Sequence, residues 1–311
     1  MKKINKILAI CGPTAVGKTS FSIEIAKHFN GEIVSCDSMQ LYKYMDIGSA
    51  KPSLEELNQV RHHLIGVVEP GEAFSVAKYK EMAAKAIDDI SGRGLLPIMA
   101  GGTGLYLDAL VFDLDFAAPP CDPKIRSELY EIAETKGNEY LHDMLKECDK
   151  AAASRIHPNN VRRVVRAIES AKSGVTLSNF SNDLKRSDKY EFVLIGLRRD
   201  RQELYDRINR RVDILIKNGL LDEVKRLKEM GLSETDIAMK GIGYKEILAY
   251  FEGKYDLEAA IDTIKKNTRH YAKRQLTWLK RYEDMKWFEL SESMDEQKSL
   301  EEIILWLEKN L

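Results

Sequence analysis

The feature that most constrains this chain is a phosphate-binding loop close to its N-terminus. A short apolar run over residues 7–11 leads directly into the motif Gly12-Pro13-Thr14-Ala15-Val16-Gly17-Lys18-Thr19. Glycines in such a loop let backbone N–H groups turn toward phosphate oxygens, the lysine adds a positive charge, and the last hydroxyl can ligate Mg²⁺. We therefore expect all eight residues to cradle a diphosphate or nucleotide, with Lys18 and Thr19 taking part in the chemistry and Thr19 as the metal ligand.

Strand-like and helix-like segments alternate after this loop. The expected strands span residues 6–11, 32–35, 63–68, 95–100 and 192–197, and the expected helices include 19–29 and 75–90. This alternation predicts an α/β fold, a parallel sheet of the P-loop NTPase type with helices on both faces. Ligands of such sheets bind at the carboxyl ends of the strands, so the residues that follow each strand are candidates for the site.

The periodicity changes in the middle of the chain. Residues 117–190 are helix-like and charged, with prolines at the start and a polar stretch near the end. We interpret this segment as an inserted all-helical domain within a core made of residues 1–116 and 191–311. The part of the core after residue 201 is expected to be nearly all helical.

Composition and cysteine placement predict a cytoplasmic protein without a membrane partner. Hydrophobic residues make up 44% of the chain and charged residues 31%, as in ordinary globular proteins. The N-terminal apolar stretch is too short for a secretory signal, and no window has the length of a membrane span. The cysteines Cys11, Cys36, Cys121 and Cys148 form no Cys-x-x-Cys pair, which favours reduced thiols.

Positive charge is concentrated although the formal net charge is only −1. Residues 265–281 hold eight basic or histidine side chains, two aromatic residues and no acid. Further arginine clusters lie at 155–166 and 198–211. Each cluster is either a solvated face or part of a surface that contacts a polyanion, where phosphate contacts and stacking on Tyr271 or Trp278 would act together.

Asp37 follows the second expected strand and lies nineteen residues after Lys18. A carboxylate there can act as a general base or hold Mg²⁺ through water, although aspartate is also a common turn former. The glycines of Gly101-Gly102-Thr103-Gly104 follow another strand, and either permit a tight turn or, as we favour, let a ligand approach closely.

Arg207 and Arg211 are four residues apart on an expected helix, so both can face one site and neutralise phosphate oxygens. The alternative is that they form surface salt bridges with Glu203 and Asp206. The residues themselves do not decide between these interpretations.

A series of motifs resembles one enzyme family, the tRNA dimethylallyltransferases. The motifs follow in the order GPTAVGKT, DSMQLY, HHLIGVVEP, GGTGLYLDAL, RRVVRAIE, RINRRVD, KGIGYKE and KRQLTWLKR, over almost the whole chain. The chain has no Cys/His zinc finger of the kind that eukaryotic relatives can carry, so the resemblance is to the bacterial form. It implies a P-loop core and an inserted helical domain that form a channel between them.

The resemblance also implies the reaction. A dimethylallyl group passes from dimethylallyl diphosphate to N6 of adenosine 37 in the anticodon loop of tRNA, with Mg²⁺ as cofactor. Asp37 would accept the N6 proton and Arg211 would bind diphosphate, a task that Arg207 could share. The residues implied to contact tRNA are Asp37, Ser38, Met39, Gln40, Thr103, Arg126, Arg162, Arg163, Lys240, Tyr244, Lys273, Arg274, Gln275, Trp278 and Lys280.

Three other functions use the same loop. A small-molecule or nucleotide kinase would transfer phosphate from ATP, an adenylate isopentenyltransferase would prenylate a free nucleotide, and a non-catalytic RNA-binding protein would use the loop as a nucleotide switch. The basic, aromatic C-terminal region disfavours the first two, and Asp37 has no task in the third. We expect a monomer.

Overall fold

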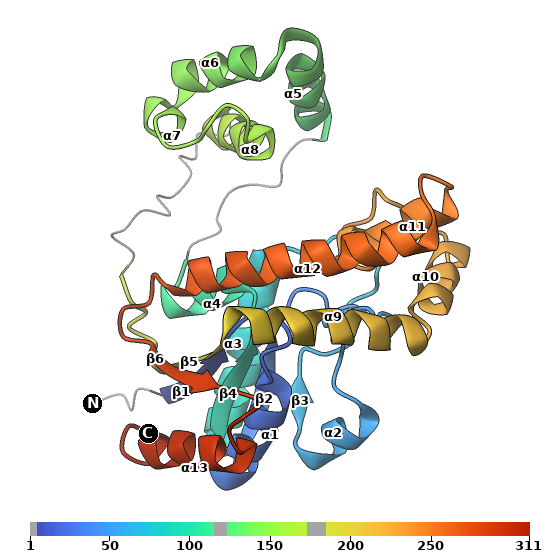
Figure 1. Cartoon of the computed structure of the whole chain (residues 1–311). Helices are drawn as coiled ribbons and strands as arrows, with labels where there is room; N and C mark the ends of the chain where they lie inside the picture. The colour runs from blue at the N-terminus through green and yellow to red at the C-terminus, as the bar shows by residue number, and fades with distance from the viewer. Residues whose placement is uncertain (1–4, 115–122, 173–184) are drawn as a thin grey trace. The chain divides into compact units, whose positions relative to one another are not determined.

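The computed structural model describes residues 5–114, 123–172 and 185–311. The chain divides into two compact units, one made of residues 1–114 with 186–311 and the other of residues 115–185 (Figure 1). The first is the core unit and the second the inserted unit. The boundaries expected from the sequence were 117 and 190.

The core unit is built on one sheet with strand order β3-β2-β4-β1-β5-β6, and the described strands pair in parallel. Gly101 of β4 lies opposite both Cys11 of β1 and Cys36 of β2, so these three strands end at the same level. The loops that follow them therefore meet at one edge. The strands are β1 (Asn5–Cys11), β2 (Gly31–Cys36), β3 (His62–His63), β4 (Leu96–Gly101), β5 (Tyr190–Arg199) and β6 (Lys286–Leu290).

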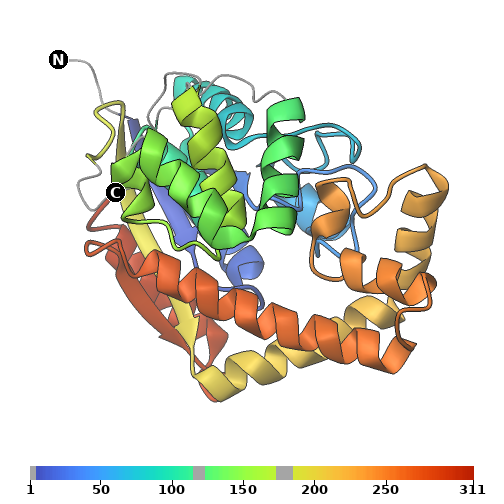
Figure 2. The same cartoon turned by 90° about the horizontal axis from the view of Figure 1, so that it is seen from above.

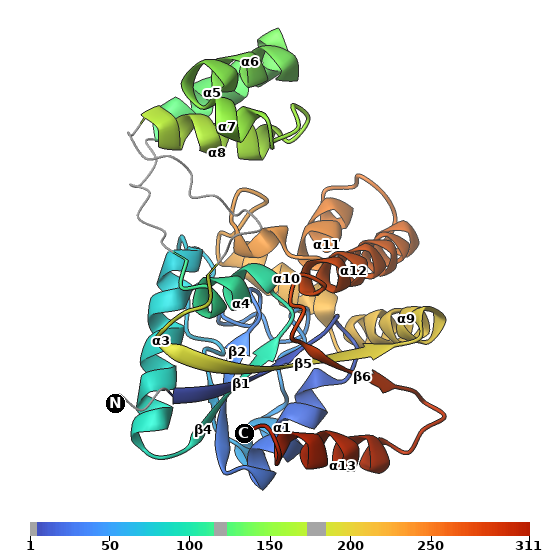
Figure 3. The same cartoon turned by 90° about the vertical axis from the view of Figure 1, so that its left-hand side faces the viewer.

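Helices cover both faces of this sheet because its central strands are apolar on both sides. Leu8 and Ile10 pack against α1 (Lys18–His28) and α13 (Glu296–Leu307), whereas Ile7 and Ala9 face the core of α3 (Val76–Gly92) and α4 (Gly104–Val111). Figure 3 shows α4 on one side of the sheet and α1 with α13 on the other. The predicted α/β fold with a parallel sheet is confirmed.

The C-terminal half of the core unit supplies most of the helices near the carboxyl ends of the strands. The helices α9 and α12 run beside one another (Figures 1 and 2), joined by a hydrogen bond of 2.6 Å from Arg269 to Asn209 and by the Lys265–Asp213 ion pair. The helices near this edge of the sheet comprise α2 from the N-terminal half of the core unit and five elements from its C-terminal half, α9 and α12 among them. Their bounds are α2 (Leu54–Gln59), α9 (Arg201–Lys217), α10 (Leu220–Glu229), the 3₁₀ turn η1 (Ala238–Lys240), α11 (Tyr244–Phe251) and α12 (Leu257–Leu279).

The inserted unit has a hydrophobic core of its own, which includes Leu141, Leu145 and Ile168. The buried Glu169 pairs with Arg126 at 2.7 Å and with Arg166 at 3.5 Å. The four described helices of this unit are α5 (Pro123–Lys136), α6 (Asn138–Cys148), α7 (Lys150–Ala153) and α8 (Val161–Lys172). No helix in the described parts of the chain is long and apolar enough to cross a membrane.

One expected strand is wrong in its extent, and one strand was not expected. The strand expected over residues 63–68 is reduced to His62–His63, because Leu64 and Gly66 both adopt positive φ, 62° and 61°, and turn the backbone out of the sheet. The region after residue 201 was expected to be nearly all helical, yet β6 pairs with β5 at the edge of the sheet. Its alternating burial, with Phe288 and Leu290 inside, is a short strand pattern that the surrounding helices masked.

Candidate active site

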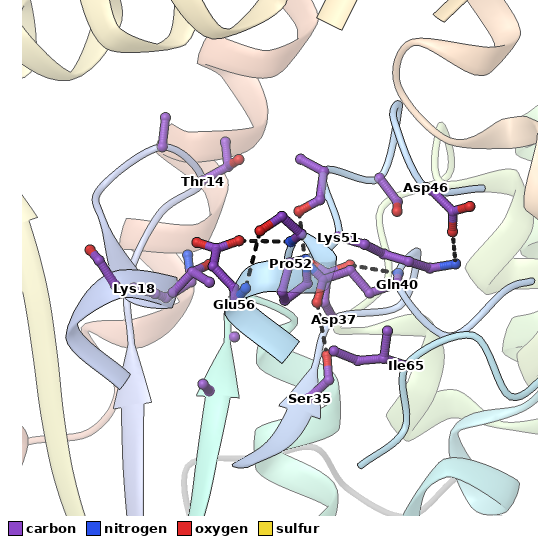
Figure 4. A pocket seen from close by; sticks show the side chains of 18 of the residues that line it. Thr14, Lys18, Ser35, Asp37, Gln40, Asp46, Lys51, Pro52, Glu56 and Ile65 are labelled. Carbon is purple, nitrogen blue, oxygen red and sulfur yellow. Dashed lines mark hydrogen bonds and ion pairs between the residues drawn. The ribbon is translucent and has the colours of Figure 1, made fainter. Parts of the chain in front are cut away.

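A cavity of about 1040 Å³ opens at the carboxyl ends of β1, β2 and β4 (Figure 4). Residues from the phosphate-binding loop, from the segment after β2, from α2, from α9 and from α12 line it together. Those that carry charge or polar groups include Lys18, Thr19, Asp37, Gln40, Lys51, Glu56, His62, Arg207, Arg211 and Gln275. The structure thus brings the predicted phosphate loop, Asp37 and both arginines to a single cavity.

Lys18 is held at the inner side of the phosphate loop. Gly17, at φ 116°, turns the chain into α1, and the Lys18 Nζ donates to the carbonyls of Gly12 at 3.0 Å and Pro13 at 2.8 Å. The pKa of Lys18 is lowered to about 8, chiefly by burial. The attraction of Asp37 opposes this shift, and the positive charge of Arg211 contributes to it. The ammonium is therefore poorly solvated and would gain from a nearby anion.

Two arginines support the outer side of the same loop. Arg207 Nε donates to the carbonyl of Ala15 and Arg199 Nε donates to that of Val16, each at 3.0 Å. Ala15 has a φ of 64°, which is unusual for a residue with a Cβ, so these bonds hold a strained turn. Arg199 is fully buried in its side chain and was not singled out from the sequence, where it is one of several adjacent arginines.

Arg211 lines the cavity, and burial lowers the pKa of its guanidinium, opposed by the attraction of Asp37. The surface salt bridges considered for the two arginines do not form among the described residues. Glu203 pairs instead with Arg199, and Arg207 lies 3.3 Å from Glu292. Arg207 thus supports the loop backbone, whereas Arg211 presents its charge to the cavity.

Asp37 forms the turn that the sequence offered as one of its interpretations, and it also lines the cavity. Its Oδ1 accepts hydrogen bonds from the backbone N–H of Met39 at 2.8 Å and Gln40 at 3.4 Å, so it forms a turn at the end of β2. Among the described residues, nothing donates a hydrogen bond to its Oδ2. The carboxylate is therefore fixed in orientation and keeps one oxygen available at the cavity.

Neighbouring side chains hold the segment that carries Asp37. Thr103 Oγ1 accepts from the backbone N–H of Ser38 at 3.1 Å, and Gln40 Nε2 donates to the carbonyl of Ala50 at 3.2 Å. The dashed line between Ser35 and Gln40 in Figure 4 marks a further contact of 3.1 Å. Thr103 and Gln40 thus serve the loop itself in this structure.

The glycines at 102 and 104 admit protein side chains. A Cβ on Gly102 would overlap with the amide of Gln275, and one on Gly104 would overlap with the ring of Trp278, both from α12. The sequence favoured close approach of a ligand at these glycines. The close approach that the structure shows is instead that of α12, which packs directly on the backbone between β4 and α4.

The residues expected to contact tRNA fall into exposed and buried groups. Gln275 is 5% exposed and Tyr244 is fully buried, with its hydroxyl donating to Glu223 at 2.8 Å. The polar groups of both side chains are bonded within the protein, whereas Trp278 is half-buried with Arg281 stacked on its ring at 4.1 Å. Those exposed to solvent are Arg126, Arg162 and Arg163 in the inserted unit and Lys240, Lys273, Arg274 and Lys280 in the core unit.

Two buried carboxylates that sequence reasoning missed hold the frame of the site. Glu223 accepts from the backbone N–H groups of residues 46, 47 and 48 at 2.8–2.9 Å, and so fixes the segment that leads to Lys51. Asp108 accepts from Trp278 Nε1, Arg281 and Tyr282, and burial raises its pKa. Glu223 lies in an ordinary charged helical sequence that does not distinguish it from a solvated acid, whereas the apolar neighbours of Asp108 on both sides are a signal of burial that could have found it.

Comparison with known proteins shows to which family the chain belongs. The model of the IPP transferase family matches residues 40–282. The chain belongs to the IPP transferase family. It is 52% identical over 293 residues to a tRNA dimethylallyltransferase of Alkaliphilus metalliredigens, covering 94% of this chain and 93% of that one. It is 50% identical over 313 residues to a tRNA dimethylallyltransferase of Clostridioides difficile, covering 100% of both.

Solved structures of other family members have the same fold. A full-length tRNA isopentenylpyrophosphate transferase from Bacillus halodurans superposes with a TM-score of 0.75 at 44% identity, covering 99% of this chain and 96% of that one. A eukaryotic dimethylallyltransferase acting on tRNA gives a TM-score of 0.79 at 30% identity, covering 95% and 78%. The resemblance inferred from the ordered motifs is confirmed.

Proposed function

We propose that this protein transfers a dimethylallyl group from dimethylallyl diphosphate to N6 of adenosine 37 in tRNA and releases diphosphate. Its relatives named tRNA dimethylallyltransferase support this activity at about 50% identity over full length. The observation that carries the site assignment is the single cavity lined by Lys18, Arg211 and Asp37. A diphosphate site and a general base for the acceptor therefore share one space.

The chemistry requires both halves of this cavity. The exocyclic N6 of adenine is a weak nucleophile, so a good leaving group and a base are needed. As N6 attacks C1 of the allyl group, the C–N bond forms, the C–O bond breaks and the electron pair leaves with diphosphate. Lys18, Arg211 and the loop N–H groups stabilise the charge on the leaving diphosphate, and Asp37 takes the proton from N6.

The donor set at the phosphate loop is compatible with Mg²⁺. The Thr19 hydroxyl at the start of α1 lines the cavity and is a hard oxygen ligand of the kind that this ion prefers. The described residues contain no cluster of three or more histidines, cysteines or acids that would bind a metal without substrate oxygens. When bound with the diphosphate, Mg²⁺ would neutralise part of its charge.

The proposal also covers the tRNA partner and the location of the protein. The exposed basic residues of α12 and of the inserted unit would contact the tRNA backbone, and adenosine 37 would leave its stack to reach the cavity. Cys11, Cys36 and Cys148 are free cysteines in the structure, and Cys121 lies outside the described residues. The cytoplasmic location and the monomeric state remain predictions.

An acceptor assay separates this function from its rivals. The purified protein is incubated with Mg²⁺, radiolabelled dimethylallyl diphosphate and, in separate reactions, unmodified tRNA, AMP or ATP. We expect label in tRNA alone. Label in AMP or ATP would indicate an adenylate isopentenyltransferase, and absence of label in every acceptor would leave the kinase or the RNA-binding protein, which an assay with γ-labelled ATP distinguishes.

A further inference from the structure

We infer that Gln275 is a positioning residue that fixes the phosphate loop relative to the segment bearing Asp37, and that it does not serve as a contact to RNA. The inference rests on the proposed function, because it names how the donor and acceptor sides of that site are held together. The residue lies on α12, between the exposed Arg274 and the half-buried Leu276, and its own side chain points into the core unit.

Both ends of the Gln275 amide are engaged by backbone. Its Oε1 accepts from the N–H of Thr14, within the phosphate loop, at 2.9 Å. Its Nε2 donates to the carbonyl of Gly102, in the loop after β4, at 2.9 Å. Of the natural side chains of this length, only an amide can accept and donate at its two ends without carrying charge. Glutamate would lose the donor, and lysine the acceptor.

The backbone at residue 102 is shaped to receive this amide. A Cβ at Gly102 would overlap with Gln275 Nε2 and would lie 3.0 Å from the carbonyl oxygen of Gly12. The φ of Gly102 is not in the left-handed region, so its glycine is required by the contact and not by a turn. The amide thus fills the space between the first residue of the phosphate loop and the loop after β4.

Two further hydrogen bonds carry the connection on to Asp37. Thr103, next to Gly102, donates its backbone N–H to the carbonyl of Cys36 at 3.1 Å, and its Oγ1 accepts from the N–H of Ser38 at 3.1 Å. These bonds flank Asp37 on both sides. Gln275 therefore links the phosphate loop, which would hold the leaving diphosphate, to the loop after β4, and Thr103 of that loop holds the segment that carries Asp37.

This arrangement predicts a specific kinetic consequence. Loss of the amide would leave the Thr14 N–H and the Gly102 carbonyl without this partner, and the two loops could shift relative to one another beyond the ends of the paired strands. Small displacements of reacting groups have large effects on rate, since the reaction needs attacking and leaving atoms in line. Donor binding and the chemical step would both suffer, whereas contacts on the outer face of α12 would remain.

The test compares Gln275→Met, which keeps the length of the side chain, with Gly102→Ala, which displaces the amide while leaving it intact. The controls are Gln297→Met, at an exposed site on α13, and Gly92→Ala, where a Cβ would meet nothing within 4 Å. Three quantities are measured: the Kd of inorganic diphosphate by calorimetry with Mg²⁺, the Kd of unmodified tRNA without donor, and the single-turnover rate. Urea unfolding shows which variants are folded.

We expect each of the two variants to weaken diphosphate binding about tenfold, to slow the single-turnover step, and to change the tRNA Kd by less than about twofold. The double variant should bind diphosphate no more weakly, and react no more slowly, than the more impaired single variant, because the two substitutions remove the same contact. If Gln275→Met does not fold, Gly102→Ala still tests the contact.

Weakened tRNA binding with unchanged diphosphate binding would make Gln275 an RNA contact and overturn the inference. Additive effects of the two substitutions, or unchanged binding and rate, would also overturn it. The diphosphate titration needs no acceptor, so it decides the role of Gln275 even if the wild-type protein were found to label no tRNA.

Discussion

Asp37 is the general base of the proposed reaction, and only one of its two oxygens is used by the turn that follows β2. Oδ1 is used by the turn to Met39 and Gln40, so the carboxylate is oriented before any substrate arrives. A variant can therefore separate the turn from proton transfer. Asparagine can still accept the hydrogen bond from the Met39 N–H, yet it takes no proton at neutral pH.

We predict that Asp37→Asn and Asp37→Ala both lower the single-turnover rate by about two to four orders of magnitude, the range for loss of a general base. Both should bind tRNA with nearly wild-type affinity, and Asp37→Asn should keep the wild-type stability to urea. Quenched-flow measurement at saturating substrates provides the rate. A wild-type rate in Asp37→Asn would remove the carboxylate from proton transfer.

The lowered pKa of Lys18, about 8, predicts a pH dependence of diphosphate binding with a definite sign. A bound diphosphate favours the charged ammonium, so it raises the pKa of Lys18 and binding takes up a proton where the free lysine is neutral. We predict that diphosphate affinity falls above about pH 8, at most tenfold per pH unit. Calorimetry in buffers of different ionisation enthalpy should detect proton uptake at pH 8.5, and a flat affinity from pH 7 to 9.5 would contradict the assignment.

At the scale of elements, buried carboxylates join helices to the loops of the site. Glu223 of α10 accepts three backbone N–H groups from residues 46–48 and the hydroxyl of Tyr244 from α11. We predict that Glu223→Ala lowers the free energy of unfolding by about 3 kcal/mol, because four buried donors lose their partner. Urea denaturation measures the loss, with the exposed Glu229→Ala of the same helix as control, and a loss below about 1 kcal/mol would show that the loop finds other partners.

The parts of the fold that sequence predicted are those set by local pattern. Glycine spacing predicted the phosphate loop, and runs of apolar residues predicted the central strands and the α/β alternation. Both signals can be recognised within a few consecutive residues. The strand expected over 63–68 ends before Leu64, because Leu64 adopts a positive φ that its sequence does not announce. The edge strand β6 is too short to stand out among helices.

The site residues likewise divide into those that a local sequence pattern singled out and those whose contacts depend on tertiary packing. The sequence singled out Lys18 through the phosphate-loop motif, and Asp37 because it directly follows β2 at the carboxyl edge of the sheet. It did not predict the partners of Gln275, since Thr14 and Gly102 come close to it only through the packing of α12 on β4. The same holds for Asp108, whose donors lie about 170 residues away in sequence.

On the scale of the whole molecule, charge is separated although the net charge is close to zero. The exposed Lys273 and Arg274 lie on α12 and the exposed Lys280 directly follows it, and phosphate contacts there would release counterions. We predict that log Kd for tRNA rises linearly with log salt and that Lys273→Ala lowers this slope by about one. Filter binding at several salt concentrations measures it, with the exposed Lys309→Ala as control, and an unchanged slope would place the RNA contact elsewhere.

The central claim is that one cavity holds the diphosphate of the donor and the base for the acceptor. The most direct measurement is the labelling of unmodified tRNA from radiolabelled dimethylallyl diphosphate in a single turnover, followed by digestion to nucleosides. The account predicts label on N6 of adenosine 37 with wild-type protein and its loss in Asp37→Asn at unchanged tRNA binding. Label on free AMP, or full labelling of tRNA by Asp37→Asn, would contradict it.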